Sequence, residues 1–597
     1  MRNFLNKVKI IAAASILLMG VAACSGGGNN AGNAHNAGNA EKNAESTDTN
    51  AATGTTQIEP YKIEVMSQLA NFAGEQGGWY GKILKDKFGL EVNITAPNLA
   101  GGAAKFATLM ASGDLGDLVI FGNDGQEYRD AIKAGLLLDW TKDGLLEKYG
   151  KDILASVPEA IEKNKKNFGE GEAVYGVGHD ASNMPPGPSE GNTMTYQLDM
   201  RWDLYQKLGS PKLTKMEDIL PLLKQMQELE PKSDSGRPMY GFSMWGDWDG
   251  NYMTLAKQFA TMHGYDIGDG FNQGSLLEIA AHEDKYQGIL DENSYYLRTL
   301  KLYYEANQMG LMDPDSLTQK FDDVVNKFKD GQVLFSWFPW LDSSYNTPAH
   351  TDAGKGFQMV GFEEQKIYSY GFSPFGGNRV WAIGAKAKHP ERIMEYINWL
   401  YTPEGMMTTA NGPEGMTWEM KDGKALLTDF GKQALKDNSQ QVPEEFGGGT
   451  YKDGGPKFNN STLKTSSINP NTNEPYDWNM WTSVLQDNPN PVDKSWREAT
   501  GALTPKELLT KTNQIALNNP ISTTEAPAVM DSMLEQKLSQ VGAIIKEQSW
   551  KMVFAKDDGE YNKLKDEMVK KAKGLGYDEI IDWQVEQTEK VFALRNK

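Results

Sequence analysis

Cysteine and positive charge are both scarce in this sequence. Only one cysteine occurs in 597 residues, which excludes a disulfide framework, a zinc site built on thiolates and paired-thiol redox chemistry. The 60 Lys and Arg residues are outnumbered by 80 Asp and Glu residues, and the formal net charge is -20. A surface this acidic repels nucleic acid and anionic lipid, so we expect no nucleic-acid partner.

Sequence signatures of nucleotide and metal sites are also missing. The chain has neither a Gly-x4-Gly-Lys-Ser/Thr phosphate loop nor a Gly-x-Gly-x-x-Gly dinucleotide fingerprint. Residues 247–251 place Asp, Asp and Asn at the alternating spacing of a calcium loop, but Tyr252 replaces the glycine that the sharp turn requires. We therefore predict a protein that holds no metal or cofactor and is not an enzyme.

An almost unbroken apolar run, residues 10–23, follows three basic residues near the N-terminus. This is the pattern of a secretion signal, and the run is too short to span a bilayer comfortably. Small residues at its end lead directly into Cys24, which resembles a bacterial lipobox. The resemblance implies that residues 1–23 are removed and that Cys24 is acylated. The alternative is an ordinary signal peptide with an incidental cysteine.

Residues 25–56 are almost entirely Gly, Asn, Ala, Ser and Thr, with no aromatic side chain and no aliphatic side chain larger than alanine. Such a segment cannot bury a face, so we predict a flexible tether over residues 24–58. A tether of this length would hold a globular body about 30 Å from its anchor. The expected location is the extracellular face of the cell membrane, with the lipid anchor as the only membrane contact.

The folded part begins with strands and helices in alternation. Alternating or continuous apolar residues predict strands over residues 61–66, 90–94 and 118–121, separated by helices over residues 80–88 and 106–110. This order argues for an α/β architecture with a parallel sheet. Further helices are predicted over residues 216–229, 295–308, 390–400, 524–551 and 560–575.

Aromatic residues are abundant: 15 Trp, 24 Tyr and 22 Phe. Two groups of them, in residues 244–252 and 335–340, lie in polar segments punctuated by Gly or Pro, where no helix or strand period would bury them. Aromatic planes with acidic and amide groups at their edges are suited to hold sugar rings, which present apolar C–H faces and hydroxyl edges. The alternative for any single tryptophan is burial in a core.

Several segments in a fixed order resemble the extracellular solute-binding proteins of ABC importers, in the sugar-binding group called family 1. The similar segments are residues 111–121, 200–209, 328–340, 374–405 and 550–583. The long lipoprotein members from Gram-positive bacteria are the most similar. The resemblance implies a two-lobed periplasmic-binding-protein-like fold of type II, with the ligand cleft between the lobes. We expect residues 59–180 with 375–510 in lobe 1, and residues 181–374 with 511–597 in lobe 2.

The resemblance also implies which residues contact the ligand. Trp340 matches the stacking aromatic of the family, and Arg201 has a buried ion pair within its lobe as an alternative role. The complete set of predicted ligand-binding residues is Asn123, Asp124, Arg201, Trp245, Asp247, Trp248, Asp249, Trp337 and Trp340.

These observations predict a lipid-anchored, monomeric receptor that captures an oligosaccharide and delivers it to the permease subunits of an ABC transporter. Two alternatives stay open. One is a cell-surface carbohydrate-active enzyme, similar to a glycoside hydrolase, whose paired carboxylates would depend on a separation that the sequence does not give. The other is a receptor for peptides or another solute.

Overall fold

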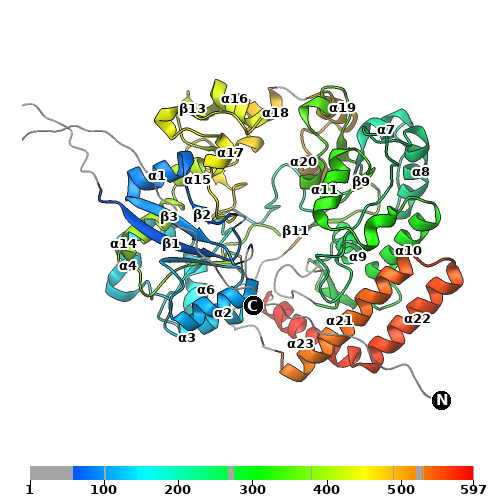
Figure 1. Ribbon diagram of the computed structural model, residues 1–597, viewed down its shortest axis with the longest axis horizontal. Helices are drawn as coiled ribbons and strands as arrows, with labels where there is room; N and C mark the ends of the chain where they lie inside the picture. The colour runs from blue at the N-terminus through cyan, green and yellow to red at the C-terminus, as the bar shows by residue number, and fades with distance from the viewer. Residues whose placement is uncertain are drawn as a thin grey trace, which may run out of the picture. The chain divides into compact units, whose positions relative to one another are not determined.

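The structure is a computed structural model that describes residues 58–595 except 71, 98, 100–101, 267–274, 281, 378, 488–489, 519–527 and 529 (Figure 1). Cys24 lies outside the described residues, as do the predicted signal peptide and all but the last residue of the tether, so these stay predictions. Among the described helices, none combines the length and the apolar character needed to cross a bilayer.

A six-stranded sheet organises the first body of the fold. Its strand order is β2-β3-β1-β4-β12-β5. β1, β3 and β4 are parallel, whereas β12 runs antiparallel to both β4 and β5. The predicted parallel sheet is therefore present with an antiparallel addition. The bounds are β1 Tyr61–Ser67, β2 Gly74–Glu75, β3 Leu90–Thr95, β4 Leu118–Phe121, β5 Val177–Gly178 and β12 Val380–Ile383.

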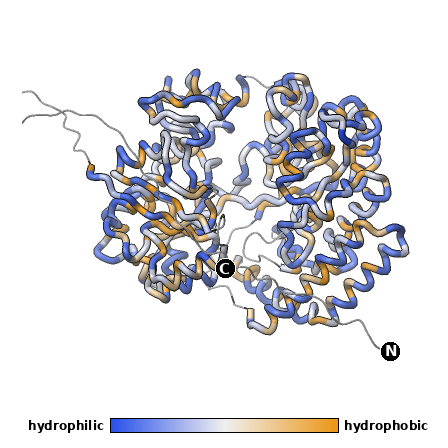
Figure 2. Tube along the Cα trace, in the orientation of Figure 1, coloured by the Kyte–Doolittle hydropathy of each residue, from blue (hydrophilic) through white to orange (hydrophobic). Residues whose placement is uncertain are grey.

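Side chains of successive strand residues enter two different hydrophobic cores. In β4, Leu118 and Ile120 belong to one cluster, whereas Val119 and Phe121 belong to another. Both faces of the sheet are thus buried, which explains why β4 is a continuous apolar run. Figure 2 shows hydrophobic residues along these strands. The covering helices include α1 Gly78–Phe88, α2 Gly102–Ser112, α3 Gln126–Lys133, α6 Pro158–Phe168, α14 Pro390–Trp399 and α15 Pro403–Asn411.

A second body forms around a three-stranded antiparallel sheet of order β10-β6-β9. Its hydrophobic cluster is the largest of the chain and takes in helices from the middle and from the end of the sequence. The bounds are β6 Asp199–Arg201, β9 Phe335–Ser336, β10 Phe357–Met359, α7 Trp202–Lys207, α8 Ile219–Leu229, α10 Tyr295–Gln308, α11 Phe321–Lys329 and α12 Pro339–Asp342.

Three helices, α21 Ser532–Val553, α22 Asp558–Gly574 and α23 Tyr577–Arg595, close the sequence and pack on this second body (Figure 1). Tyr296 Oη of α10 and Ser549 Oγ of α21 share a hydrogen bond of 2.7 Å. The helix predicted from residue 524 begins later, because the Asp531 side chain accepts from two backbone N–H groups of the first turn and caps the helix. Most residues from 524 to 529 lie outside the described part.

The chain passes between the two bodies more than once, and one residue, Glu190, joins three of these segments through its carboxylate and its backbone carbonyl. Glu190 Oε2 accepts from Ser369 Oγ at 2.6 Å, and Glu190 Oε1 accepts from Tyr370 N at 2.9 Å. Lys506 Nζ donates to the Glu190 backbone carbonyl at 2.6 Å. The predicted lobe boundaries stay a prediction. Within residues 492–509, which that prediction assigns to lobe 1, the side chains of Val492, Trp496, Ala502 and Leu509 pack in the hydrophobic cluster of the second body.

Candidate functional site

Two large aromatic side chains stand exposed next to each other in the second body. Trp248 exposes 40% of its surface and Trp340 exposes 47%. Their ring centroids lie 6.1 Å apart, and each also contacts Phe321 and Phe338. We call Trp245, Trp248, Phe321, Phe338 and Trp340 the aromatic patch. Trp248 comes from the irregular loop after residue 243, Phe321 begins α11, and Trp340 lies on α12.

The base of the aromatic patch is buried. Trp245 is 1% exposed and meets Trp248 edge to face, with centroids 4.9 Å apart. Behind it, Trp337 stacks on Trp245 at 6.5 Å and donates its indole N–H to Gln258 Oε1 at 2.9 Å. Trp245 and Trp337 therefore serve as core residues that support the exposed rings. The patch can present an apolar plane to a ring with C–H faces.

The two predicted aspartates beside the patch have different environments. Asp247 is exposed and accepts a long hydrogen bond of 3.4 Å from Phe321 N. Asp249 accepts from Trp550 Nε1 at 2.7 Å and from Thr254 N at 2.8 Å. Burial raises the pKa of Asp249 to about 6. Asp249 thus anchors the loop to α21, whereas Asp247 is exposed and makes one long hydrogen bond.

Arg201 is fully buried in the second body. Its guanidinium makes two hydrogen bonds to Asp203, of 2.9 and 3.0 Å, and one to Glu230 of 3.1 Å. It also lies over the Tyr345 ring, 4.7 Å from the centroid. These contacts are the intra-lobe ion pair that the sequence left open as an alternative to ligand binding.

Asn123 and Asp124 lie at the carboxyl end of β4, in the body of the six-stranded sheet. Asn123 is exposed, and its Oδ1 accepts from Gly125 N at 2.9 Å. Asp124 lies 3.8 Å from Lys163 Nζ, and burial raises the pKa of its carboxyl although Lys163 opposes the shift. The structure therefore separates these two residues from the aromatic patch, which is built on the other body.

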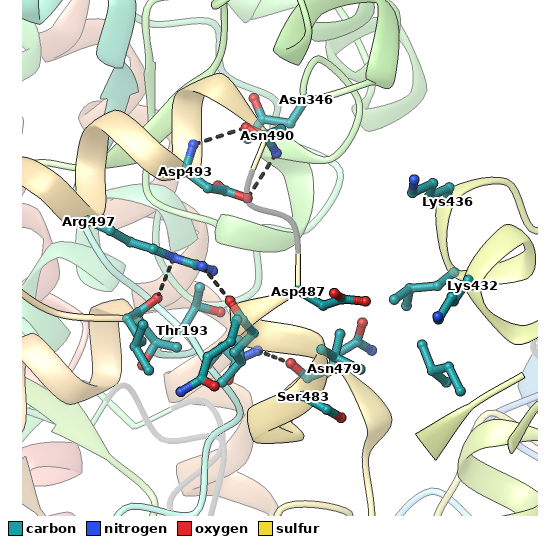
Figure 3. A pocket seen from close by; sticks show the side chains of 18 of the residues that line it. Thr193, Asn346, Lys432, Lys436, Asn479, Ser483, Asp487, Asn490, Asp493 and Arg497 are labelled. Atoms are coloured by element: carbon teal, nitrogen blue, oxygen red, sulfur yellow. Dashed lines mark hydrogen bonds between the residues drawn. The ribbon is translucent and has the colours of Figure 1, made fainter. Parts of the chain in front are cut away.

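A large cavity of about 1340 Å³ is lined by both bodies (Figure 3). None of the nine predicted ligand-binding residues lines it. One wall is formed by β14 Lys424–Leu427 and α16 Asp429–Lys436, and another by β10, α12 and α19 Pro491–Thr500. The cavity borders the aromatic patch through α12, because Pro339 lines the cavity and its neighbour Trp340 belongs to the patch.

Charged and amide side chains dominate the lining of the large cavity. Figure 3 shows Lys432 and Lys436 on one side, with Asp487 pointing toward Lys432 from the other. Arg497 is already engaged, since it donates to the backbone carbonyls of Leu485 and Leu503. Lysines, amides and carboxylates of this lining are groups of the kind that can hydrogen-bond the hydroxyl edge of a ligand.

Sequence reasoning missed a pair of acids at the bottom of the large cavity. Asp199 on β6 is 1% exposed and Asp342 on α12 is 4% exposed. Gln197 Nε2 donates to Asp199 Oδ1 at 2.7 Å, and the two carboxyl groups contact each other. Burial raises the pKa of both carboxyl groups. The negative charge of Asp199 raises the pKa of Asp342 further, whereas the hydrogen bonds from Asp342 and Gln197 partly offset the rise at Asp199. The available signal was an aspartate set between two apolar residues, Leu198 and Met200, at the start of β6.

Comparisons with known proteins agree on one class. A family model described as bacterial extracellular solute-binding protein matches residues 79–415. The chain is 21% identical to lipoprotein LipO of Bacillus subtilis (strain 168) over 388 residues, which cover 61% of this chain and 70% of LipO.

Solved structures show the same fold at low sequence identity. The alginate-binding protein AlgQ2 without calcium ion has a TM-score of 0.57 at 16% identity, over 89% of this chain and 98% of AlgQ2. The S. pneumoniae ABC-transporter substrate-binding protein FusA in complex with kestose has a TM-score of 0.57 at 14% identity, over 90% of this chain and 100% of FusA. Both likenesses place the chain in the two-lobed binding-protein fold.

Proposed function

Because the chain belongs to the family of bacterial extracellular solute-binding proteins, we propose that it captures an oligosaccharide outside the cell and delivers it to an ABC transporter permease. The observation that carries the proposal is the aromatic patch, where Trp248 and Trp340 stand exposed on a buried aromatic base. Exposed indoles cost free energy in water, and a sugar ring would cover them. The similar folds of an alginate-binding protein and of a kestose complex support a carbohydrate ligand.

In this proposal the ligand stacks on Trp248 and Trp340 and extends along α12 into the large cavity. The cavity supplies amides, lysines and carboxylates for the hydroxyl groups. A volume of about 1340 Å³ exceeds the range of about 300–1,000 Å³ typical of small-ligand pockets, which favours several sugar units over one. Asn123 and Asp124, from the other body, are proposed to contact the ligand only when the two bodies close on it.

We further propose that the chain is a monomer held at the outer face of the cell membrane by an acylated Cys24 and the tether of residues 24–58. The sequence pattern around Cys24 supports this anchor. A Cys24→Ser variant should appear in the culture medium, whereas the unaltered chain should fractionate with membranes and carry the lipid mass.

The competing function is a carbohydrate-active enzyme. Residues 187–191 match the Gly-x-Ser-x-Gly spacing of a serine nucleophile, but they lie in irregular chain between β5 and β6, and Ser189 is only 3% exposed. A nucleophile elbow needs an exposed serine on a strand-to-helix turn. Asp199 and Asp342 contact each other, whereas glycosidase carboxylates stand roughly 5–9.5 Å apart around the sugar bond.

One experiment separates these functions. The mature chain is incubated with a panel of oligosaccharides and peptides, followed by thermal-shift and calorimetric measurements and by chromatography of the products. A rise in melting temperature with the oligosaccharide recovered intact supports the receptor. Shorter sugars in the chromatogram would support the enzyme, and a shift with peptides alone would support a receptor for another solute.

A further inference from the structure

A smaller cavity of about 320 Å³ lies inside the first body, and we call it the inner pocket. It shares no lining residue with the large cavity or with the aromatic patch. Side chains from several elements form it: Tyr80 from α1, Trp381 from β12, Tyr396 from α14, and Phe458 and Asn460 from the irregular segment after α17 Tyr451–Gly454. Its volume far exceeds the roughly 10–15 Å³ that one buried water requires.

Several buried polar atoms of the inner pocket have no hydrogen-bond partner within the described chain. Trp381 Nε1 has none although Trp381 is 1% exposed. Both side-chain polar atoms of Asn460 also lack partners, so whichever way the amide is turned, one donor and one acceptor remain. Buried polar groups are nearly always paired in folded proteins. The inner pocket therefore calls for an occupant that both accepts and donates hydrogen bonds.

The charges around the inner pocket favour a neutral occupant. Burial lowers the pKa of His179 to about 4, so the imidazole is uncharged at neutral pH. Asp180 is paired with Lys464, whose Nζ lies 3.2 Å from the carboxylate. At His179 and Asp180, a charged occupant would therefore find no unpaired opposite charge. Arg379 also lines the inner pocket, and it is exposed to solvent.

Aromatic rings form the remaining walls. The rings of Trp381 and Phe458 meet at 5.6 Å with an interplanar angle of 69°. The hydroxyl groups of Tyr80 and Tyr396 are hydrogen-bonded to each other at 3.0 Å, which leaves the ring surfaces as the apolar contribution of these residues. An occupant must combine apolar faces with hydroxyl edges, as a sugar ring does.

We propose that the inner pocket is a second binding site, specific for one neutral, hydroxyl-rich ring the size of a monosaccharide. Its ring oxygens or hydroxyls would accept from Trp381 Nε1 and from the Asn460 amide, and a hydroxyl would donate to Asn460 Oδ1. The site goes beyond the proposed capture function, because it requires neither the aromatic patch nor the large cavity. The ring has two possible sources, a free monosaccharide or the terminal unit of a longer chain.

The test titrates the whole mature chain with free glucose, galactose, mannose and fructose, and with glucuronate and glucosamine as charged counterparts. We expect at least one neutral hexose to bind by calorimetry, and the charged counterparts to bind about tenfold more weakly or not at all. Trp381→Phe removes the indole N–H but keeps an aromatic ring, and Asn460→Leu removes the amide at similar volume. Each should weaken hexose binding about tenfold, whereas Met533→Ala, a surface change on α21, should not.

A crystal structure of the unaltered chain soaked with the hexose keeps the test decisive if a variant fails to fold. Density for a ring against Trp381 and Asn460 supports the proposal, and a free hexose there identifies the monosaccharide source. If an oligosaccharide places its terminal ring there while no hexose does, the ring comes from a longer chain. Ordered water alone at saturating sugar, or unchanged hexose binding in both variants, would overturn the proposal that the inner pocket binds a sugar ring. Neither result bears on oligosaccharide capture at the aromatic patch.

Discussion

Trp340 is the residue on which the proposed recognition depends most. Its indole is 47% exposed and sits on Phe338, with centroids 5.0 Å apart. Trp340→Ala should weaken oligosaccharide binding by about 1–3 kcal/mol, because a large stacking surface is lost. Calorimetry measures the affinity, and circular dichroism should show unchanged secondary structure.

Trp340→Phe is the matched comparison and should retain part of the affinity. Met533→Ala removes a side chain that is 73% exposed at a remote position of α21, and it should bind like the unaltered chain. Equal affinities for Trp340→Ala and the unaltered chain would remove Trp340 from the site.

The acid pair Asp199 and Asp342 predicts how stability changes with pH. Burial raises the pKa of Asp199 above that of the unfolded chain, so between about pH 4 and the raised value the folded chain holds a proton that the unfolded chain releases. Stability is thus lost as the pH rises through this window. Asp199→Asn removes this titration and can donate to Asp342, so it should gain about 1 kcal/mol or more at pH 7 relative to pH 4.

Melting temperatures recorded from pH 4 to pH 7 measure this effect. Asp487→Asn makes the same chemical change at an exposed position of the large cavity and serves as the control. If the two variants follow the same pH profile, the acid pair does not account for the dependence.

Residue types alone could not separate ligand contacts from internal ones. The exposed indoles were predicted from turn-like sequence, and the structure exposes Trp248 and Trp340 but buries Trp245 and Trp337 in the same segments. The role of Arg201 could not be assigned from the sequence. Its partner Asp203 is two residues away, but its other partner, Glu230, comes from a different part of the chain. Which of two similar side chains is covered depends on contacts between distant segments, and sequence patterns do not encode them.

At the scale of elements, α21 touches the loop of the aromatic patch through a glycine. A Cβ added at Gly542 would lie 2.7 Å from the Asn251 backbone, within the loop that also carries Trp248 and Asp249. Gly542→Ala gains helix propensity of about 1 kcal/mol, but the clash with rigid backbone should cost more, for a net loss of about 1–3 kcal/mol. Ligand affinity should fall together with stability, because the loop that carries Trp248 must move.

Gly574→Ala is the matched control at the end of α22, where an added Cβ meets nothing within 4 Å. It should be neutral or slightly stabilising, as measured by chemical denaturation. A Gly542→Ala chain as stable as this control would mean that α21 and the loop are not held in close contact.

Elements with a strong local pattern were predictable, and elements that depend on distant partners were not. The run Leu118–Phe121 and the helix over residues 295–308 have the predicted bounds. The sequence gives no sign that β12 joins β4 and β5, because that pairing is set by tertiary contacts. The start of α21 depends on the Asp531 cap, and a pattern of apolar residues does not reveal a single polar capping residue.

At the scale of the whole molecule, the proposed function requires the two bodies to approach each other around the ligand. A ligand that contacts both bodies favours the closed arrangement by its differential affinity. Small-angle scattering should therefore give a smaller radius of gyration with saturating oligosaccharide than without. An identical profile in both conditions would exclude hinge closure, even if calorimetry shows binding.

The position of β12 in the chain has a consequence for how the molecule is made. Residues 179–379 intervene between β5 and β12, although the two strands are hydrogen-bonded neighbours. Closing so long a loop is entropically costly, and non-local pairing slows folding. The first sheet stays unfinished until nearly two thirds of the polypeptide has been synthesised, so a nascent chain released before Val380 would expose the edge of β4 to aggregation.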